Sequence, residues 1–196
     1  MNNYDKMLAD AKKRCAGYDM AALAAKPGVE DTPVYLKTCF LGQEVRISKA
    51  DAQVTVDGKN ADFGQALSVY DWLCDGKPGA VSSGEFCPIS SLPGVYVSGK
   101  GLGMQMPALS KRIDGNPDRF RAGMAAIGAK EIPLGDLGWE LDVFPDFPMQ
   151  LKFYFGDEEF PPQLTLFWDK NSLQFVRYET LYYIAGCLHA RLQQLF

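Results

Sequence analysis

The segment from Pro148 to Asp169 constrains the fold of this chain more than any other. Two apolar, aromatic runs, 149–155 and 163–168, flank the acidic turn Asp157-Glu158-Glu159, and Pro161-Pro162 follows that turn. Strand-forming residues on both sides of a short polar turn predict an antiparallel hairpin. Such a hairpin excludes an all-helical fold, and it does not require the long crossover of a parallel sheet.

The rest of the chain mixes helical and strand patterns without regular alternation. Apolar periodicity and capping residues predict helices over 3–16, 19–25, 62–74, 103–113, 117–128 and 177–195. Alternating patterns predict strands over 34–41, 44–48, 53–56, 139–144, 149–155 and 163–168. We expect Gly42-Gln43 to turn the first hairpin and Asp169 to Ser172 to form a turn. The irregular region 80–101 contains either short strands or a functional loop.

These patterns predict an α+β fold. It consists of a mostly antiparallel sheet built from hairpins, with helices packed on it and an amphipathic helix at the C-terminus. A length of 196 residues favours one domain spanning 1–196, and 47% hydrophobic residues supply a substantial core. The sequence contains neither internal repeats nor a low-complexity tract.

Charge and hydropathy limit the partners and the location of the protein. The net charge of −4 disfavours nucleic acid and anionic membrane surfaces as partners. The N-terminal residues lack a signal-peptide pattern, and no apolar run reaches the ~20 residues that span a bilayer. We therefore expect a soluble cytoplasmic protein, whose oligomeric state the sequence leaves open.

The five cysteines do not form a recognisable ligand set. They are scattered, and no Cys-x-x-Cys pair occurs, so the spacing predicts neither a zinc ribbon nor a local iron–sulfur cluster. Without a signal peptide we expect reduced, mostly buried thiols. Cys87 lies in a Gly- and Ser-rich loop where an exposed nucleophile is an alternative, but its base would have to be His189.

Two further features have a structural and a functional interpretation. His189 is the only histidine, and it lies near Tyr182 on the predicted last helix. It is either a packed structural residue or an axial ligand or general base, and a multi-histidine metal site is excluded. The run Gly99-Lys100-Gly101-Leu102-Gly103 is either a flexible connector or an anion-binding loop, and it matches no phosphate-binding motif.

The acidic turn also has two interpretations. Asp157, Glu158 and Glu159 either form a solvated turn or direct alternate side chains toward a hard cation. The sequence predicts no dedicated metal ligands beyond this alternative, and Asp169 is expected at the opposite end of its strand from the turn.

Over nearly its whole length, and most clearly in its C-terminal half, the chain resembles the uncharacterised prokaryotic domain-of-unknown-function family 3786. The resemblance rests on Phe155-Gly156-Asp157-Glu158-Glu159-Phe160-Pro161-Pro162, then Leu166-Phe167-Trp168-Asp169, then Tyr178-Glu179-Thr180-Leu181. The family implies a cytoplasmic setting in anaerobes and a link to one-carbon or corrinoid metabolism. In some members, the family domain looks like one part of a fusion whose other part is a four-cysteine iron–sulfur segment. This sequence contains no such segment. The resemblance supplies no catalytic residues and leaves the cofactor unknown.

We therefore expect an accessory or binding domain that recognises a small ligand, a cofactor or a partner protein. Its site would be a pocket between the sheet and the last helix, with Tyr182, His189 and the acidic turn Asp157–Glu159 as candidate residues. If the ligand is a corrinoid or haem, His189 is the expected axial ligand. The alternatives are a metal-dependent or acid/base enzyme that uses the acidic turn, and a structural partner subunit.

Overall fold

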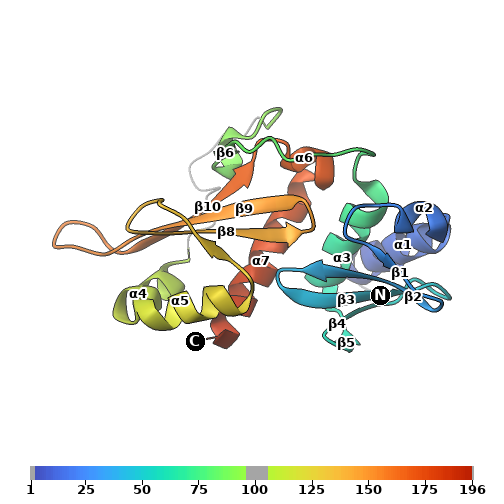
Figure 1. Ribbon diagram of the computed structural model, residues 1–196, viewed down its shortest axis with the longest axis horizontal. Coiled ribbons are helices and arrows are strands. Elements are labelled where there is room, and N and C mark those ends of the chain that lie inside the picture. Colours follow the sequence, from blue (N-terminus) through green and yellow to red (C-terminus); the bar gives the residue numbers. More distant parts are fainter. Residues whose placement is uncertain (1–2, 96–105, 196) are drawn as a thin grey trace.

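The computed structural model describes residues 3–95 and 106–195, and these residues form two antiparallel sheets with helices between and around them (Figure 1). The predicted α+β class is therefore confirmed, with two sheets where the sequence led us to expect one. The predicted glycine-rich run 99–103 and the start of the predicted 103–113 helix lie outside the described residues.

The first sheet is a five-stranded meander. Its strands follow sequence order: β1 (Glu30–Asp31), β2 (Tyr35–Phe40), β3 (Gln43–Ser48), β4 (Val54–Val56) and β5 (Lys59–Asn60). One face is buried because apolar residues alternate along the strands, so that Leu36 pairs with Ile47 across β2 and β3.

The second sheet contains the hairpin predicted from the signature segment. Its strand order is β6-β10-β9-β8-β7. The strands are β6 (Phe86–Cys87), β7 (Lys130–Glu131), β8 (Leu137–Phe144), β9 (Phe147–Tyr154) and β10 (Gln163–Asp169). β9 and β10 pair from Met149↔Trp168 to Tyr154↔Gln163, which confirms the hairpin. Asp169 lies at the far end of β10 from the acidic turn, as expected.

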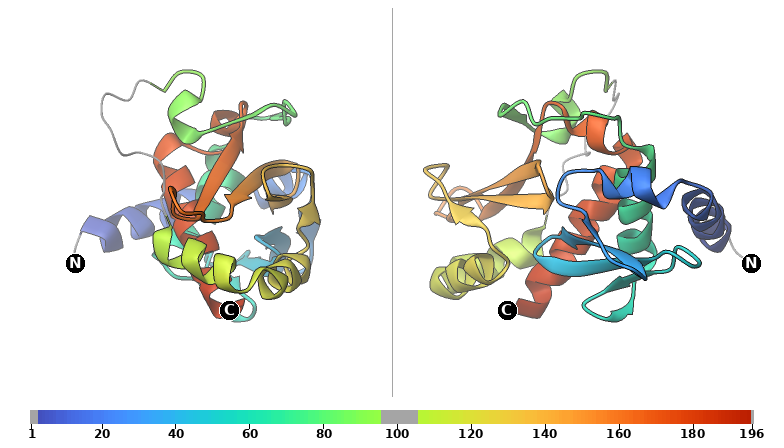
Figure 2. Two further views of the ribbon diagram at one scale, coloured as in Figure 1. Left: turned by 90° about the vertical axis from the view of Figure 1, so that its left-hand side faces the viewer. Right: turned by 45° about the vertical axis from the view of Figure 1, so that its right-hand side comes forward.

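The helices join the two sheets. α7 (Tyr178–Leu195) passes between the sheets and packs against α3 (Phe63–Tyr70), as the two views of Figure 2 show. The Phe63 and Tyr183 rings meet edge to face at 5.3 Å in this contact. The other helices are α1 (Asn3–Ala16), α2 (Met20–Ala24), α4 (Pro107–Gly115), α5 (Pro117–Ala126) and α6 (Ser172–Phe175).

An aromatic stack connects the two sheets in the core. The Phe40 and Phe144 ring centroids lie 4.7 Å apart, and Trp72 also stacks on Phe144, with ring centroids 4.5 Å apart. Beside this stack the Leu41 N–H donates to the Val143 carbonyl at 2.9 Å. One buried apolar cluster therefore includes residues from both sheets and from α7.

Four local features differ in part or wholly from the predictions. The first hairpin turns at Leu41-Gly42, one residue earlier than predicted, with φ of 49° and 73°. The predicted 62–74 helix changes at Asp71 into a π-helix, η1 (Asp71–Asp75). The predicted 169–172 turn continues into α6. The two-residue strands β1, β5 and β7 were missed because two residues do not establish an alternating pattern, whereas β6 lies in the 80–101 region, for which short strands were one of the two alternatives.

Candidate functional site

A cavity of about 110 Å³ lies between β10, the 3₁₀ turn η2 (Ile89–Ser91) and α7. We name it the β10–α7 cavity. Its lining residues are Pro88, Ile89, Ser90, Gln163, Leu164, Thr165, Leu166, Trp168, Leu181, Tyr182 and Ala185. The location agrees with the expected pocket between a sheet and the last helix.

The cavity exists because β6 covers only one end of β10. β6 pairs with Trp168 and Asp169, and no other described strand pairs with the outer edge of β10. The Leu164 N–H on that edge instead donates to the Ser110 hydroxyl of α4 at 3.1 Å. On the opposite wall, the small Ala185 side chain of α7 leaves space that a larger residue would fill.

The lining combines apolar walls with neutral polar groups. Its polar side chains are Ser90, Gln163, Thr165 and Tyr182, and none of the described lining residues is acidic or basic. The Tyr182 hydroxyl shares a 2.8 Å hydrogen bond with the Tyr178 hydroxyl one turn earlier. Burial and this hydrogen bond raise the pKa of Tyr182 to about 12, so its phenol is neutral at physiological pH.

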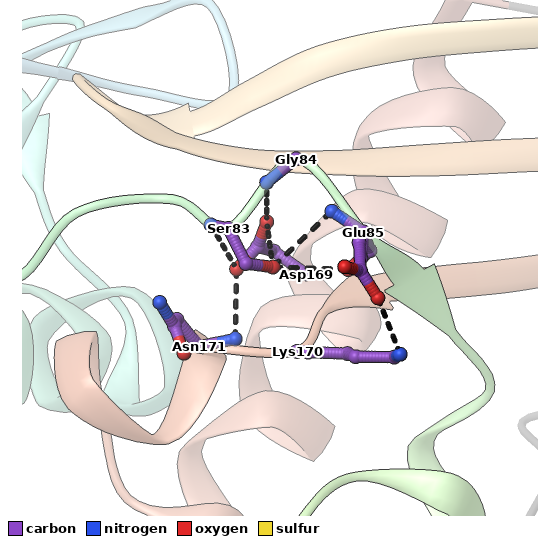
Figure 3. Close-up of polar contacts among 6 residues, drawn as sticks. All are labelled: Ser83, Gly84, Glu85, Asp169, Lys170 and Asn171. Carbon is purple, nitrogen blue, oxygen red and sulfur yellow. Dashed lines mark hydrogen bonds and ion pairs between the residues drawn. The ribbon is translucent and has the colours of Figure 1, made fainter.

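Asp169 fixes the loop that leads to the cavity wall (Figure 3). Its buried carboxylate accepts hydrogen bonds from the Ser83 and Gly84 N–H groups at 3.0 and 2.9 Å, and from Asn171 N–H at 2.7 Å. The hydroxyls of Ser82 and Ser83 also donate to it. These contacts hold the 82–84 loop against the end of β10 and so position β6 and the residues of η2 that follow.

The charge of Asp169 is stabilised despite its burial. Burial alone would raise the pKa of the carboxyl, but the hydrogen bonds from Ser82, Ser83 and Asn171 outweigh it and lower the pKa. A neighbouring ion pair joins Lys170 to Glu85 at 2.5 Å and ties the same loop to β10 from the solvent side (Figure 3).

The structure brings only one of the five candidate residues into the cavity lining. Tyr182 lines it, whereas His189 lies two helical turns farther along the same face of α7. The His189 Nε2 atom is buried and has no hydrogen-bond partner among the described residues.

The acidic turn lies at the end of the hairpin that projects away from α7 (Figure 1). The Asp157 carboxylate accepts the N–H groups of Glu159 and Phe160 at 2.8 and 2.7 Å, and these contacts lower its pKa. Glu158 and Glu159 are exposed. Asp157 therefore closes the turn. Within residues 3–95 and 106–195, no group of three or more His, Cys, Asp or Glu side chains is placed to hold a metal ion.

A corrinoid or haem does not fit the described residues. A cavity of about 110 Å³ is comparable to cavities that hold a single benzene-sized ring, so it is too small for a macrocycle of four rings. The enclosed Nε2 atom of His189 offers no open approach for an axial metal ion.

The alternative nucleophile Cys87 is not exposed. Its side chain is buried in β6, and burial raises the pKa of the thiol, which disfavours the reactive thiolate.

The sequence did not single out Ser90, Gln163 and Thr165 as site residues. The only available signal was the irregular 80–101 region, interpreted as short strands or a functional loop, and its residues Pro88 to Ser90 line the cavity. Trp168 is both buried and part of the lining.

The comparison with protein families decides the relationship suggested by the signature segment. The model of a domain of unknown function, DUF3786, matches residues 19–191. The chain belongs to the DUF3786 family. The match includes β10, η2 and most of α7, and it leaves α1 outside. Neither the curated proteins nor the solved structures give a match. None of the helices in the described part of this DUF3786 protein is long and apolar enough to cross a membrane.

Proposed function

We propose that this DUF3786 protein is a binding domain that takes one small, neutral, ring-bearing group into the β10–α7 cavity. The observation that carries the proposal is the uncharged lining around a space of about 110 Å³. The group belongs either to a free small molecule or to a side chain of a partner protein. The expected link to anaerobic one-carbon metabolism then concerns the ligand or partner, not a macrocycle held by this chain.

The lining determines the chemistry of that group. Apolar walls from Leu166, Trp168 and Leu181 favour burial of a ring, whereas Ser90 and Thr165 offer hydroxyls to one polar substituent. An ionised group would lose its hydration without gaining a counter-ion from the described lining. Neutral phenols fit this environment better than carboxylates or amines.

Nuclear magnetic resonance with p-cresol as the added compound tests the proposal. We expect amide signals of Thr165, Leu166 and Ala185 to shift on titration, and benzoate at equal concentration to leave them unchanged. The substitution Ala185→Leu fills the cavity from α7, and Thr165→Leu fills it from β10. Each should weaken p-cresol binding by about tenfold or more, equivalent to about 1.4 kcal/mol.

The matched control is Ala190→Leu, the same change at an exposed position of α7. It should bind p-cresol as the wild type does. Shifts confined to residues outside the lining, or equal binding by folded Ala185→Leu and Thr165→Leu proteins, would overturn the proposal.

A further inference from the structure

Two cysteines far apart in the sequence meet beside the π-helix. Cys15 of α1 is fully buried, and Cys74 of η1 is half-buried. Their thiols share a side-chain hydrogen bond. The residues next to them confirm that the two segments face each other, because Arg14 and Asp75 form an ion pair at 2.9 Å.

The remaining contacts fix this arrangement. Cys15 follows the buried Ala11 by one helical turn, so both point from α1 toward the core. On the other side, Cys74 follows Tyr70 by four positions, and Tyr70 donates its hydroxyl to the Ala52 carbonyl at 2.7 Å. Tyr70 is buried, so this bond anchors the segment that carries Cys74 in the core.

The environment favours a thiolate at one member of the pair. The hydrogen bond from Cys74 and the nearby Arg14 lower the pKa of Cys15, and the first of these outweighs its burial. The same contact raises the pKa of Cys74. A pair with one ionised and one protonated sulfur is suited to thiol–disulfide exchange, in which the thiolate is the nucleophile.

We propose that Cys15 and Cys74 form a reversible dithiol–disulfide site that reacts with low-molecular-weight disulfides such as glutathione disulfide. The half-buried Cys74 thiol passes its proton to the neighbouring Cys15 thiolate, and the Cys74 thiolate attacks one sulfur of the oxidant and releases the first small thiolate. Cys15 gives up this proton to that small thiolate through solvent, and the Cys15 thiolate then attacks the Cys74 sulfur of the mixed disulfide and releases the second. Counted from a pair with one thiol and one thiolate, the protein loses two electrons and one proton, and a proton from water completes the two small thiols.

The disulfide would attach α1 to the part of the chain that the family model matches. Residue 15 lies outside the range matched by the family model, and residue 74 lies inside it. Oxidation therefore anchors a helix outside the matched range to η1, the segment that also contains Asp71. This inference is independent of the proposed ligand cavity, because neither cysteine lines it.

The test uses the folded, reduced full chain incubated with glutathione disulfide, then alkylated and analysed by mass spectrometry. We expect a loss of two hydrogen masses, alkylation of three of the five cysteines, and a cross-linked peptide pair containing Cys15 and Cys74. Dithiothreitol should reverse the change. Cys39→Ser, a change at an exposed cysteine, should leave the cross-link intact.

Single substitutions identify the order of the two steps. Cys15→Ala should stop the reaction at a stable glutathione adduct on Cys74, and Cys74→Ser should prevent reaction of Cys15. A stable adduct on Cys74 in the wild-type protein, without the cross-link, would overturn the proposal. Full alkylation of all five cysteines after oxidation, in protein shown to be folded by circular dichroism, would overturn it as well.

Discussion

The carboxylate of Asp71 accepts two hydrogen bonds from Arg177, which lies 106 positions later in the chain. The Arg177 backbone N–H donates at 2.8 Å and its Nε at 2.6 Å, and the Thr180 hydroxyl donates at 2.6 Å. Asp71 is fully buried and lies at the start of the π-helix. It therefore supplies, from a distant segment, the negative charge that stabilises the N-terminus of α7.

We predict that Asp71→Ala lowers the free energy of unfolding by about 3 kcal/mol, because it leaves the buried Thr180 hydroxyl and the start of α7 without an acceptor. Asp71→Asn should cost about 2 kcal/mol, since it keeps the volume but loses the charge. Urea unfolding measures both values. The control is Asp118→Asn, whose exposed ion pair with Arg121 should contribute less than about 1 kcal/mol. Equal losses at positions 71 and 118 would contradict this account.

The second prediction concerns pH and Asp169. Because the folded protein lowers the pKa of this carboxyl from its ordinary 3.8, its contribution is present above about pH 4 and is lost as the pH falls through the folded value. Wild-type stability should therefore decline as the pH falls below about 4. Asp169→Asn should be less stable at neutral pH and decline less steeply over that range.

Unfolding by urea at several pH values measures this difference in slope. Asp118→Asn is a suitable control, because the Asp118 side chain is 91% exposed and should leave the slope near that of the wild type. A decline equally steep in Asp169→Asn and the wild type would show that other groups cause the acid sensitivity.

Two glycines with nearly the same backbone conformation should differ in their tolerance of alanine. Gly42 and Gly58 have φ of +73° and +75°. A Cβ at Gly42 would lie 2.5 Å from the Ile127 carbonyl oxygen, whereas at Gly58 it would meet no atom within 4 Å. Gly58→Ala should cost about 1 kcal/mol for the left-handed conformation alone. Gly42→Ala should cost at least about 2 kcal/mol more, as measured by thermal unfolding.

A titration of the tyrosines tests the environment of Tyr182. Its pKa of about 12 means that the folded state favours the neutral phenol, so this contribution to stability is present below about pH 10 and is lost as the pH rises through 12. In an ultraviolet titration, Tyr182→Phe should remove one of the nine tyrosines from the late-ionising fraction only.

The sequence predicted those helices and strands that follow from the pattern of neighbouring residues. The β9–β10 hairpin follows from alternation and its acidic turn, and α7 follows from an apolar stripe that includes Leu181, Ile184 and Leu188. The π-helix was not predictable in this way. The helical pattern continues through residues 71–75, and the change of geometry accompanies the contact between Asp71 and Arg177 across the fold. Likewise, the left-handed conformation of Leu41 depends on burial between the two sheets.

The candidate site residues likewise fall into those that the sequence predicted and those that it did not. Tyr182 was identifiable because it lies beside the apolar stripe of α7. Ser90 and Thr165 were not, since their side chains converge only when η2 and β10 come together. Asp157 attracted attention as part of an acidic run, but its carboxylate accepts two backbone N–H groups of its own turn. A run of charges in a sequence does not show which of them are already satisfied locally.

The position of α7 between the sheets has a consequence for synthesis on the ribosome. This helix follows every strand in the sequence, yet it packs against α3 and completes the wall opposite β10. Synthesis proceeds at about 5–20 residues per second, so both sheets leave the ribosome seconds before α7, the helix that lies between them. During that interval the apolar face around Leu166 and the open edge of β10 are accessible to other chains, so chaperone protection should matter most just before residues 178–195 emerge.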